Sequence, residues 1–182
     1  MEQHDDLVLV RRCLNGDANA FAGLVKQHQR AVFNVAYRIV RDYEDACDVA
    51  QSAFVKAYEK LDTFNEQYKF FSWIYRIAVN EALNFVNKRK PEDELDERMV
   101  SNARGPEQLT EIGERNEQIQ SALQDLPPDY RTVIVLRHFR ELSYKEMAEV
   151  LLIPEKTVKS RLFTARRLLK DILIEHGIVD HE

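Results

Sequence analysis

Residues 143–170 constrain the fold of this chain more than any other stretch. Their pattern predicts two short helices joined by a tight turn. In the second helix, apolar residues recur at helical spacing and form one stripe: Val158, Leu162, Ala165 and Leu169. The opposite face carries polar, basic and aromatic side chains: Lys156, Lys159, Ser160, Phe163, Arg166, Arg167 and Lys170. A helix that is apolar behind and basic in front fits a DNA major groove, with packing of Phe163 as the alternative to a base contact.

Charge is unevenly distributed along the chain. The net charge of −5 divides into zero for residues 1–92, −6 for residues 93–128 and +1 for residues 129–182. Because phosphate contacts supply most non-specific affinity for DNA, we expect such a chain to bind DNA poorly alone. This distribution indicates a partner that brings the DNA contacts together.

Several other classes of protein are disfavoured. No apolar run approaches the roughly 20 residues of a membrane span, and the acidic N-terminus does not resemble a signal peptide, so we expect a cytoplasmic protein. Cys13 and Cys47 lack neighbouring ligands at metal-site spacing, which favours reduced thiols and no metal. No glycine-rich phosphate loop, zinc-protease or nucleophile-elbow motif is present, so we expect neither catalysis nor a cofactor.

The rest of the sequence also predicts helices, over residues 5–14, 17–40, 42–61 and 70–88. Asp17 is a candidate cap for the second of these. Charged and polar residues then predict a flexible acidic linker. Helical periodicity resumes with Leu109 and Ile112, and Asp129 is a candidate cap for a helix over residues 130–140. We therefore predict an all-α chain with two small domains, 1–90 and 109–182, joined by the linker 91–108.

The helix over residues 70–88 has a broad apolar side and a narrow polar face. The polar face consists of Arg76, Asn80, Asn84 and Asn87, with Trp73 at its head and Lys88, Arg89 and Lys90 at its foot. Asparagine amides match base edges, basic side chains hold phosphates, and aromatic rings stack on unpaired bases. The alternative is a solvated polar face with Trp73 in the core. The sequence alone leaves both interpretations open.

The helix over residues 42–61 opens with clustered acids, Asp42, Glu44, Asp45 and Asp48, followed by Gln51. Acidic residues are favourable at the positive end of a helix dipole, so a solvated helix end is one interpretation. A docking surface for a basic partner is the other. A carboxylate-metal enzyme is a more distant possibility, because the spacing matches no calcium loop.

Together, three segments resemble those of group 4, extracytoplasmic-function bacterial sigma factors of the sigma-E type. Residues 42–58 (DYEDACDVAQSAFVKAY) are similar to region 2.2, which binds core RNA polymerase. Residues 70–82 (FFSWIYRIAVNEA) resemble regions 2.3 and 2.4, which read and open the −10 element. Residues 126–137 (LPPDYRTVIVLR) and the helix-turn-helix resemble region 4, which reads the −35 element. The large regions 1.1 and 3 of housekeeping sigma factors have no room here.

The resemblance implies three sets of contacts. Docking on the β′ clamp helices of the polymerase would involve Asp42, Asp45, Asp48, Gln51 and Phe54. The β flap of the polymerase is a further contact that the resemblance implies. Recognition and opening of the −10 element would involve Phe64, Trp73, Arg76, Asn80, Asn84, Lys88 and Arg89. Asn80 would lie near a flipped base, beside the loop 64–71. Recognition of the −35 element would involve Lys156, Thr157, Lys159, Ser160, Phe163, Arg166 and Arg167.

The resemblance further implies that the linker threads toward the polymerase active-site cleft. It also implies an anti-sigma factor, in this family often membrane-bound, that holds the protein inactive. The chain departs from the family pattern at Ser52 (usually acidic), Leu152 and Lys156 (often Gly) and Thr164 (Arg in the sigma-E branch). A competing interpretation is a dimeric helix-turn-helix repressor with an N-terminal dimerisation or ligand domain.

Overall fold

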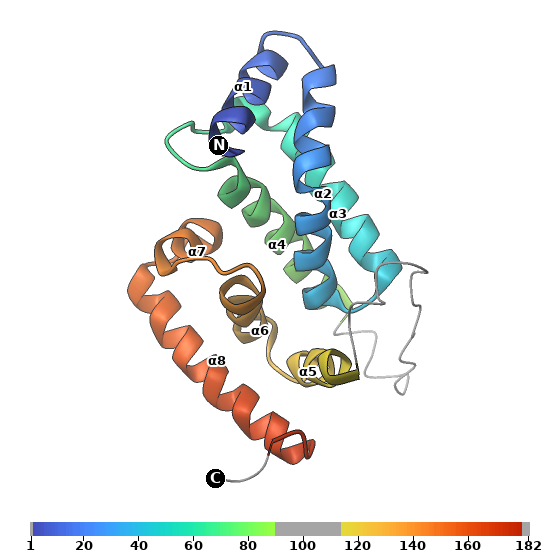
Figure 1. Cartoon of the computed structure of the whole chain (residues 1–182), viewed down its shortest axis with the longest axis vertical. Coiled ribbons are helices and arrows are strands. Elements are labelled where there is room, and N and C mark those ends of the chain that lie inside the picture. Colours follow the sequence, from blue (N-terminus) through green and yellow to red (C-terminus); the bar gives the residue numbers. More distant parts are fainter. Residues whose placement is uncertain (1, 90–113, 180–182) are drawn as a thin grey trace.

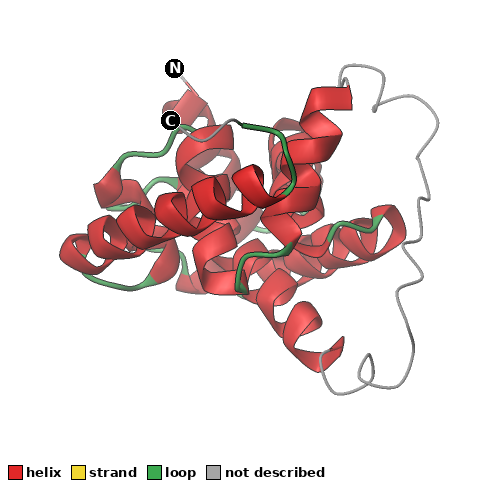
Figure 2. Ribbon diagram, turned by 90° about the horizontal axis from the view of Figure 1, so that it is seen from below, coloured by secondary structure: helices red, strands yellow, loops and turns green. Residues whose placement is uncertain are grey.

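The computed structural model describes residues 2–89 and 114–179, and every regular element in these two ranges is helical (Figures 1 and 2). An N-terminal module contains α1 (Glu2–Leu14), α2 (Asn19–Val40), α3 (Tyr43–Glu59), the short 3₁₀ turn η1 (Leu61–Thr63) and α4 (Phe70–Arg89). A C-terminal module contains α5 (Glu114–Gln124), α6 (Pro128–Ile134), the π-helical turn η2 (Val135–Phe139), α7 (Tyr144–Leu151) and α8 (Glu155–Glu175). The all-α prediction is confirmed. The predicted linker 91–108, Leu109 and Ile112 lie outside the described residues.

The core of the N-terminal module lies where α2, α3 and α4 pack against one another. The largest fully buried side chains there are Leu24, Ile39, Phe70 and Ile74. Removing these apolar side chains from water is the main force that holds the three helices together. α1 packs across α2 and closes one end of this bundle (Figure 1).

The two predicted aspartate caps have different outcomes. The residue that precedes α2 is Ala18, in a helical conformation that makes no side-chain cap, so Asp17 does not occupy the capping position itself. The carboxylate of Asp17 still faces the start of α2: a 2.7 Å hydrogen bond from Arg12, with smaller contributions from the backbone N–H groups of Ala20 and Asn19, lowers its pKa. The predicted cap at Asp129 is wrong. α6 begins at Pro128, so Asp129 lies in its first turn, where a negative charge still favours the helix dipole. Proline suits a first helical position because it needs no N–H partner there.

Helix ends also differ from the sequence prediction in smaller ways. α1 starts at Glu2 rather than residue 5, and α3 ends at Glu59 before the separate turn η1. The helix predicted over residues 130–140 is instead α6 followed by the π-helical turn η2. Asp42 caps α3, because its carboxylate accepts the backbone N–H of Asp45 at 3.0 Å.

The predicted helix-turn-helix consists of α7 and α8. Ser143 and Glu146 form a reciprocal capping box at the start of α7, which satisfies two backbone donors. Leu152 ends α7 with φ of 53°, the left-handed region that favours glycine. The departure at Leu152 therefore falls at a position that does need positive φ. The predicted apolar stripe of α8 is buried at Val158, Leu162 and Ala165, while Leu169 is half-buried.

The two modules contact each other, and a buried arginine is central to that contact. Arg131 donates to the carbonyl oxygens of Leu123, Gln124 and Leu126 at the end of α5, and to that of Ile39 near the end of α2. Burial lowers the pKa of Arg131 to about 10, so the guanidinium stays protonated at neutral pH. Gln120 of α5 adds a 3.3 Å hydrogen bond to the carbonyl oxygen of Arg38. These donors meet the negative end of the α2 dipole.

Within the two described ranges, no helix combines the length and apolar character needed to cross a membrane.

Candidate nucleic-acid interface

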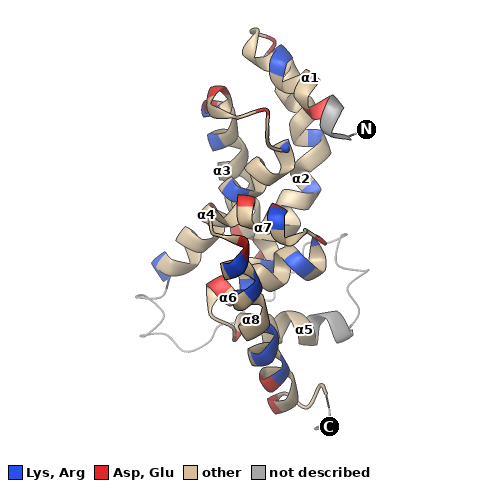
Figure 3. Cartoon of the chain, turned by 90° about the vertical axis from the view of Figure 1, so that its left-hand side faces the viewer, with Lys and Arg blue, Asp and Glu red and all other residues tan. Residues whose placement is uncertain are grey.

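The first candidate surface is the outer face of α8. Phe163 is 73 % exposed, so the packing alternative for this residue is wrong. The side chains of Lys156, Lys159, Ser160, Arg166 and Arg167 are also exposed, whereas Thr157 is half-buried. Lys and Arg run along α8 in Figure 3. The helix thus presents an aromatic ring among cations, which suits apolar contact with a base and ionic contact with phosphates.

Two neighbours position the cations of this face. The ring of Tyr144, on α7, lies 5.4 Å from the ammonium of Lys159 and 5.2 Å from the guanidinium of Arg137. The Nε of Arg166 donates to Nε2 of His138 at 3.2 Å. Burial lowers the pKa of His138, and the nearby charges of Arg166 and Arg137 lower it further. Sequence analysis missed these three contacts, because they join residues from different helices.

The second candidate surface is the polar face of α4. Asn80, Asn84, Lys88 and Arg89 are exposed along it, and Arg76 is half-buried. Trp73 is only 6 % exposed. Its ring therefore lies in the core, as the alternative interpretation from the sequence predicted. The stacking role predicted for Trp73 and Phe64 therefore depends on how much of each ring a nucleic acid can reach.

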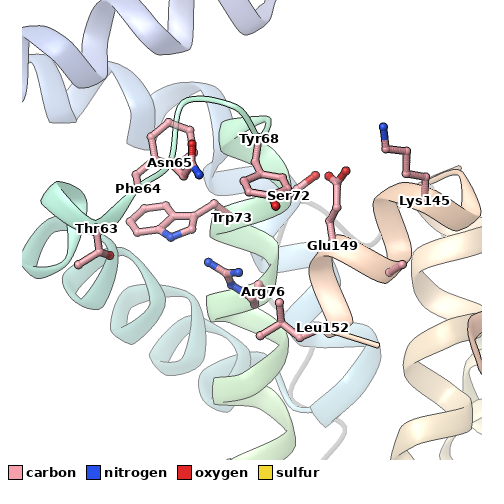
Figure 4. A pocket seen from close by; sticks show the side chains of 11 residues that line it. Thr63, Phe64, Asn65, Tyr68, Ser72, Trp73, Arg76, Lys145, Glu149 and Leu152 are labelled. Atoms are coloured by element: carbon pink, nitrogen blue, oxygen red, sulfur yellow. The ribbon is translucent and has the colours of Figure 1, made fainter. Parts of the chain in front are cut away.

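A pocket of about 600 Å³ lies between α4 with its preceding loop and α7, whose Lys145, Ala148, Glu149 and Leu152 form the other wall, and it reaches these aromatic residues (Figure 4). Phe64 and Trp73, with ring centroids 5.4 Å apart, lie on the same wall as Arg76. Ser72 also lines the pocket, and its buried hydroxyl has no hydrogen-bond partner among the described residues. Aromatic faces, a cation and an unsatisfied hydroxyl together suit a nucleobase and its adjoining phosphate.

The acidic residues at the start of α3 have different contacts, whereas the sequence prediction treated their carboxylates alike. Asp42 is the helix cap, and Asp45 forms a 2.6 Å ion pair with Arg89 of α4. Burial raises the pKa of Asp45, even though the charge of Arg89 acts in the opposite direction. Asp48 and Gln51 remain exposed. Within the described residues, no group of three or more His, Cys, Asp or Glu side chains is arranged to hold a metal ion.

An apolar groove of about 950 Å³ lies between α2 and α3. Gln51 and Phe54 line it, so two of the predicted polymerase contacts share this surface. Val55 and Tyr58 line it as well and are 51 % and 52 % exposed. Exposed apolar side chains in a groove are typical of a docking site for another protein. Sequence analysis missed Val55 and Tyr58. The feature that could have identified them is that they are apolar residues placed outside the buried stripe of α3.

An exposed basic helix, an aromatic pocket and an apolar groove are the surfaces expected of a two-module, helical DNA-binding protein that also docks on another protein. Residues 24–92 match the family model for sigma-70 region 2, and residues 116–169 match that for sigma-70 region 4. The chain therefore belongs to the sigma-70 family, in its extracytoplasmic-function (ECF) group, and functions in transcription initiation.

The similarity to individual family members extends over nearly the whole chain. The chain is 35 % identical to the RNA polymerase sigma-H factor of Pseudomonas aeruginosa, covering 95 % of this chain and 96 % of that protein. It is 37 % identical to the ECF RNA polymerase sigma-E factor of Escherichia coli, covering 92 % and 94 %. The structure of CnrH in complex with the cytosolic domain of CnrY matches with a TM-score of 0.71 and 27 % identity, covering 94 % of this chain and 98 % of that one. These comparisons favour the sigma factor over the repressor interpretation.

Proposed function

We propose that this chain, as an ECF sigma factor, gives core RNA polymerase its promoter specificity by reading a −35 element with α8 and capturing a −10 base with α4. The observation that carries the proposal is that one chain has both a surface suited to duplex DNA and a pocket suited to an unpaired base. The α8 face is convex, basic and exposed, as duplex recognition requires. The pocket beside α4 is concave and aromatic, as capture of an unpaired base requires.

The −35 contact is assigned to side chains that project from α8. Lys159 and Phe163 lie one turn apart on the exposed face, so they would enter the major groove together. Arg166 and Arg167 follow toward the end of the helix, where they would contact phosphates. Lys156, Thr157 and Ser160 complete the face at its N-terminal end, where recognition helices meet base edges.

The −10 contact is assigned to α4 and the pocket. Flipping a base out of the stack costs a few kcal/mol, and a preformed pocket offsets part of that cost. Asn80 and Asn84 offer donors and acceptors on the exposed side of the helix, while Lys88 and Arg89 supply phosphate contacts at its end. Phe64, Trp73 and Arg76 would hold the extruded base.

Docking on polymerase is assigned to α3 and the groove beside it. Asp48 and Gln51 offer polar contacts, and the apolar lining around Phe54 offers area for burial against the β′ clamp helices. Contact of the C-terminal module with the β flap is carried over from the family. Held on one large scaffold, two weak DNA-binding surfaces gain affinity through effective concentration.

The proposal includes a regulator and a location. The matched CnrH structure is a complex with the cytosolic domain of CnrY, which supports a membrane-bound anti-sigma factor as a partner of this chain. We also propose a cytoplasmic location, because the proposed partner, core RNA polymerase, is in the cytoplasm. The chain itself is proposed to have no catalytic activity, because polymerase performs the chemistry.

A gel-shift experiment tests the proposal. A pool of genomic DNA fragments is incubated with this protein, with core polymerase, and with both. A discrete set of fragments retained only by the mixture, and competed by polymerase carrying another sigma factor, is expected. Selective retention by the protein alone, as a dimer, would contradict the proposal and revive the repressor interpretation.

A further inference from the structure

The loop 64–69, which precedes α4, forms part of the pocket assigned to the −10 base. Phe64, Asn65 and Tyr68 of this loop line the pocket, whereas Glu66 and Gln67, which lie between them in the sequence, do not. Glu66 is exposed. The loop therefore has an inner side that lines the pocket and an outer side that does not.

Asn65 shapes the loop into a tight turn. Its side-chain oxygen accepts the backbone N–H of Gln67 at 2.9 Å, and its backbone carbonyl accepts that of Tyr68 at 3.0 Å. An asparagine side chain that bonds the backbone two residues ahead is a common turn former. Glu66 lies within this turn, so a contact that fixes Glu66 also restrains Asn65 and Tyr68.

Arg11 of α1 makes such a contact with Glu66. Its Nε donates to one carboxylate oxygen at 3.1 Å, and its Nη2 donates to the other at 2.5 Å. Figure 1 shows α1 beside the loop that joins α3 to α4. A bidentate pair of guanidinium and carboxylate fixes orientation as well as distance. α1 thus holds the outer side of the turn.

Such a contact can position the loop only if α1 is itself held in place. Val10 is fully buried, and Leu9 packs so closely over α2 that a β-carbon on Gly23 would lie 3.0 Å from its Cδ1. Asp6 is only 3 % exposed, and a 2.9 Å hydrogen bond joins its carboxylate to His28 of α2. A buried carboxylate is costly without such a partner. α1 is therefore docked on α2 in one defined position.

A second set of contacts leads from α1 to the same pocket. The ring of His28, which Asp6 bonds, lies 5.3 Å from that of Phe70, the first residue of α4. Phe70 is fully buried, and its ring lies 5.6 Å from that of Phe64 and 5.7 Å from that of Trp73. Aromatic rings at these separations pack as one cluster. The aromatic lining of the pocket is thus connected to α1 through His28.

We propose that α1 positions the loop that captures the −10 base, with Arg11 as a positioning residue that acts through Glu66. Neither of these two side chains lines the pocket, so their effect on an extruded base is indirect. Both side chains are exposed, so the ion pair contributes little to the stability of the whole fold and its effect is local. The inference rests on the proposed function insofar as it takes an extruded base to be the occupant of the pocket.

Three variants of the full chain test the positioning role. Arg11→Gln and Glu66→Gln each remove the ion pair from one side, and the Arg11→Glu, Glu66→Arg double variant reverses it. Arg12→Gln is the matched control, because Arg12 is the neighbouring exposed arginine of α1 and its 2.7 Å ion pair is with Asp17 instead of the loop. Glutamine is a good helix former, so α1 is preserved. Urea denaturation confirms that all four variants are folded.

Hydrogen–deuterium exchange measures the restraint on the loop without DNA or polymerase. Arg11→Gln and Glu66→Gln are expected to speed exchange of the backbone N–H groups of Gln67 and Tyr68 by about threefold, because the turn loses its outer contact. The reversed pair and Arg12→Gln should exchange like the wild type. Unchanged exchange in both single variants would overturn the proposal.

Promoter opening then tests whether the restraint serves base capture. A promoter selected by run-off transcription is incubated with core polymerase and each variant, and potassium permanganate footprinting follows opening. Arg11→Gln and Glu66→Gln are each expected to slow opening by about threefold with closed-complex binding unchanged, and the reversed pair to restore it. Slower opening with Arg11→Gln alone would identify Arg11 as a direct DNA contact and overturn the positioning role.

Two further outcomes separate this inference from the proposed function. Normal opening by both single variants, despite faster exchange of the loop, would overturn the positioning role while leaving the proposed function intact. Wild-type opening that does not respond to Asn80→Ala would contradict the proposed function, and the exchange experiment would still decide whether α1 holds the loop.

Discussion

Asp45 and Arg89 lie 44 positions apart in the sequence and form an ion pair of 2.6 Å between the start of α3 and the end of α4. The proposed function assigns these residues to different partners, Asp45 to polymerase and Arg89 to DNA phosphates. The pair therefore links the two surfaces.

Charge reversal tests the docking surface. Asp48→Lys is expected to weaken binding to core polymerase by about tenfold, because it places a cation where a basic partner docks. Asp45→Lys should do the same and also repel Arg89. Asp171→Lys, at an exposed carboxylate of α8, is the control and should bind like the wild type. A pull-down with purified core polymerase gives the affinities, and unchanged binding of both α3 variants would remove α3 from the docking surface.

Substitution of Arg131 tests the contact that joins the modules. Arg131→Met leaves four backbone carbonyls without their donor, so the free energy of unfolding should fall by about 3 kcal/mol. Arg167→Met, at an exposed arginine of α8, should change it by less than about 0.5 kcal/mol. Urea denaturation followed by circular dichroism measures both. A similar decrease in the free energy of unfolding in the two variants would show that the hydrogen bonds of buried Arg131 add no stability beyond that of an exposed arginine.

Recognition of the −35 element should depend on Lys159 and Phe163. Alanine at either position is expected to cost roughly 1–3 kcal/mol of discrimination if the side chain reads a base. Lys26→Ala, at an exposed lysine of α2, is the control. Transcription from promoters with every single −35 substitution measures the preference profile. A profile that stays the same in both variants would exclude these residues from base recognition.

Opening of the −10 element should depend on Asn80. Alanine there is expected to slow open-complex formation more than it weakens the closed complex, because a captured base exists only after opening. Gln27→Ala, at an exposed residue of α2, should affect neither step. Potassium permanganate footprinting reports opening, and a gel shift at low temperature reports closed-complex binding. Equal losses in the two assays would contradict base capture.

Stability should depend on pH through His138. Its pKa lies below the ordinary value, because burial and the nearby arginines disfavour the charged imidazole. Its contribution to stability is therefore complete above about pH 6.5 and is lost as pH falls through the lower folded-state pKa. The difference in unfolding free energy between the wild type and His138→Gln should shrink as pH falls below 6.5. Urea denaturation over a pH series measures it, and a constant difference would show that the bond to Arg166 does not respond to protonation.

Local patterns predicted much of this molecule. The buried stripe and exposed basic face of α8 follow from helical periodicity alone, and the structure places Val158, Leu162 and Ala165 inside and Phe163 outside. The same approach left Trp73 undecided, because α4 is apolar on most of its circumference and its stripe has no sharp edge. Burial of that ring depends on Phe64 and Phe70, which only the folded loop brings beside it.

Contacts between distant segments could not be predicted in this way. Arg131 looks like any other arginine in the sequence, and its role arises only because the end of α2 lies next to α5 and α6. The surroundings of Asp17 were predicted only in part for a related reason. Its carboxylate faces the first backbone N–H groups of α2 but also bonds to Arg12, and Ala18 has a helical backbone where a capping residue is usually extended.

Run-off transcription tests the central claim most directly. Purified core polymerase is given a pool of genomic fragments with and without this protein, and the transcript starts are mapped. The protein is expected to produce a small set of new starts, each preceded by shared −35 and −10 sequences, and these starts should disappear with an Asn80→Ala, Phe163→Ala double variant. Identical transcripts with and without the protein, from polymerase that responds normally to another sigma factor, would contradict promoter recognition by this chain.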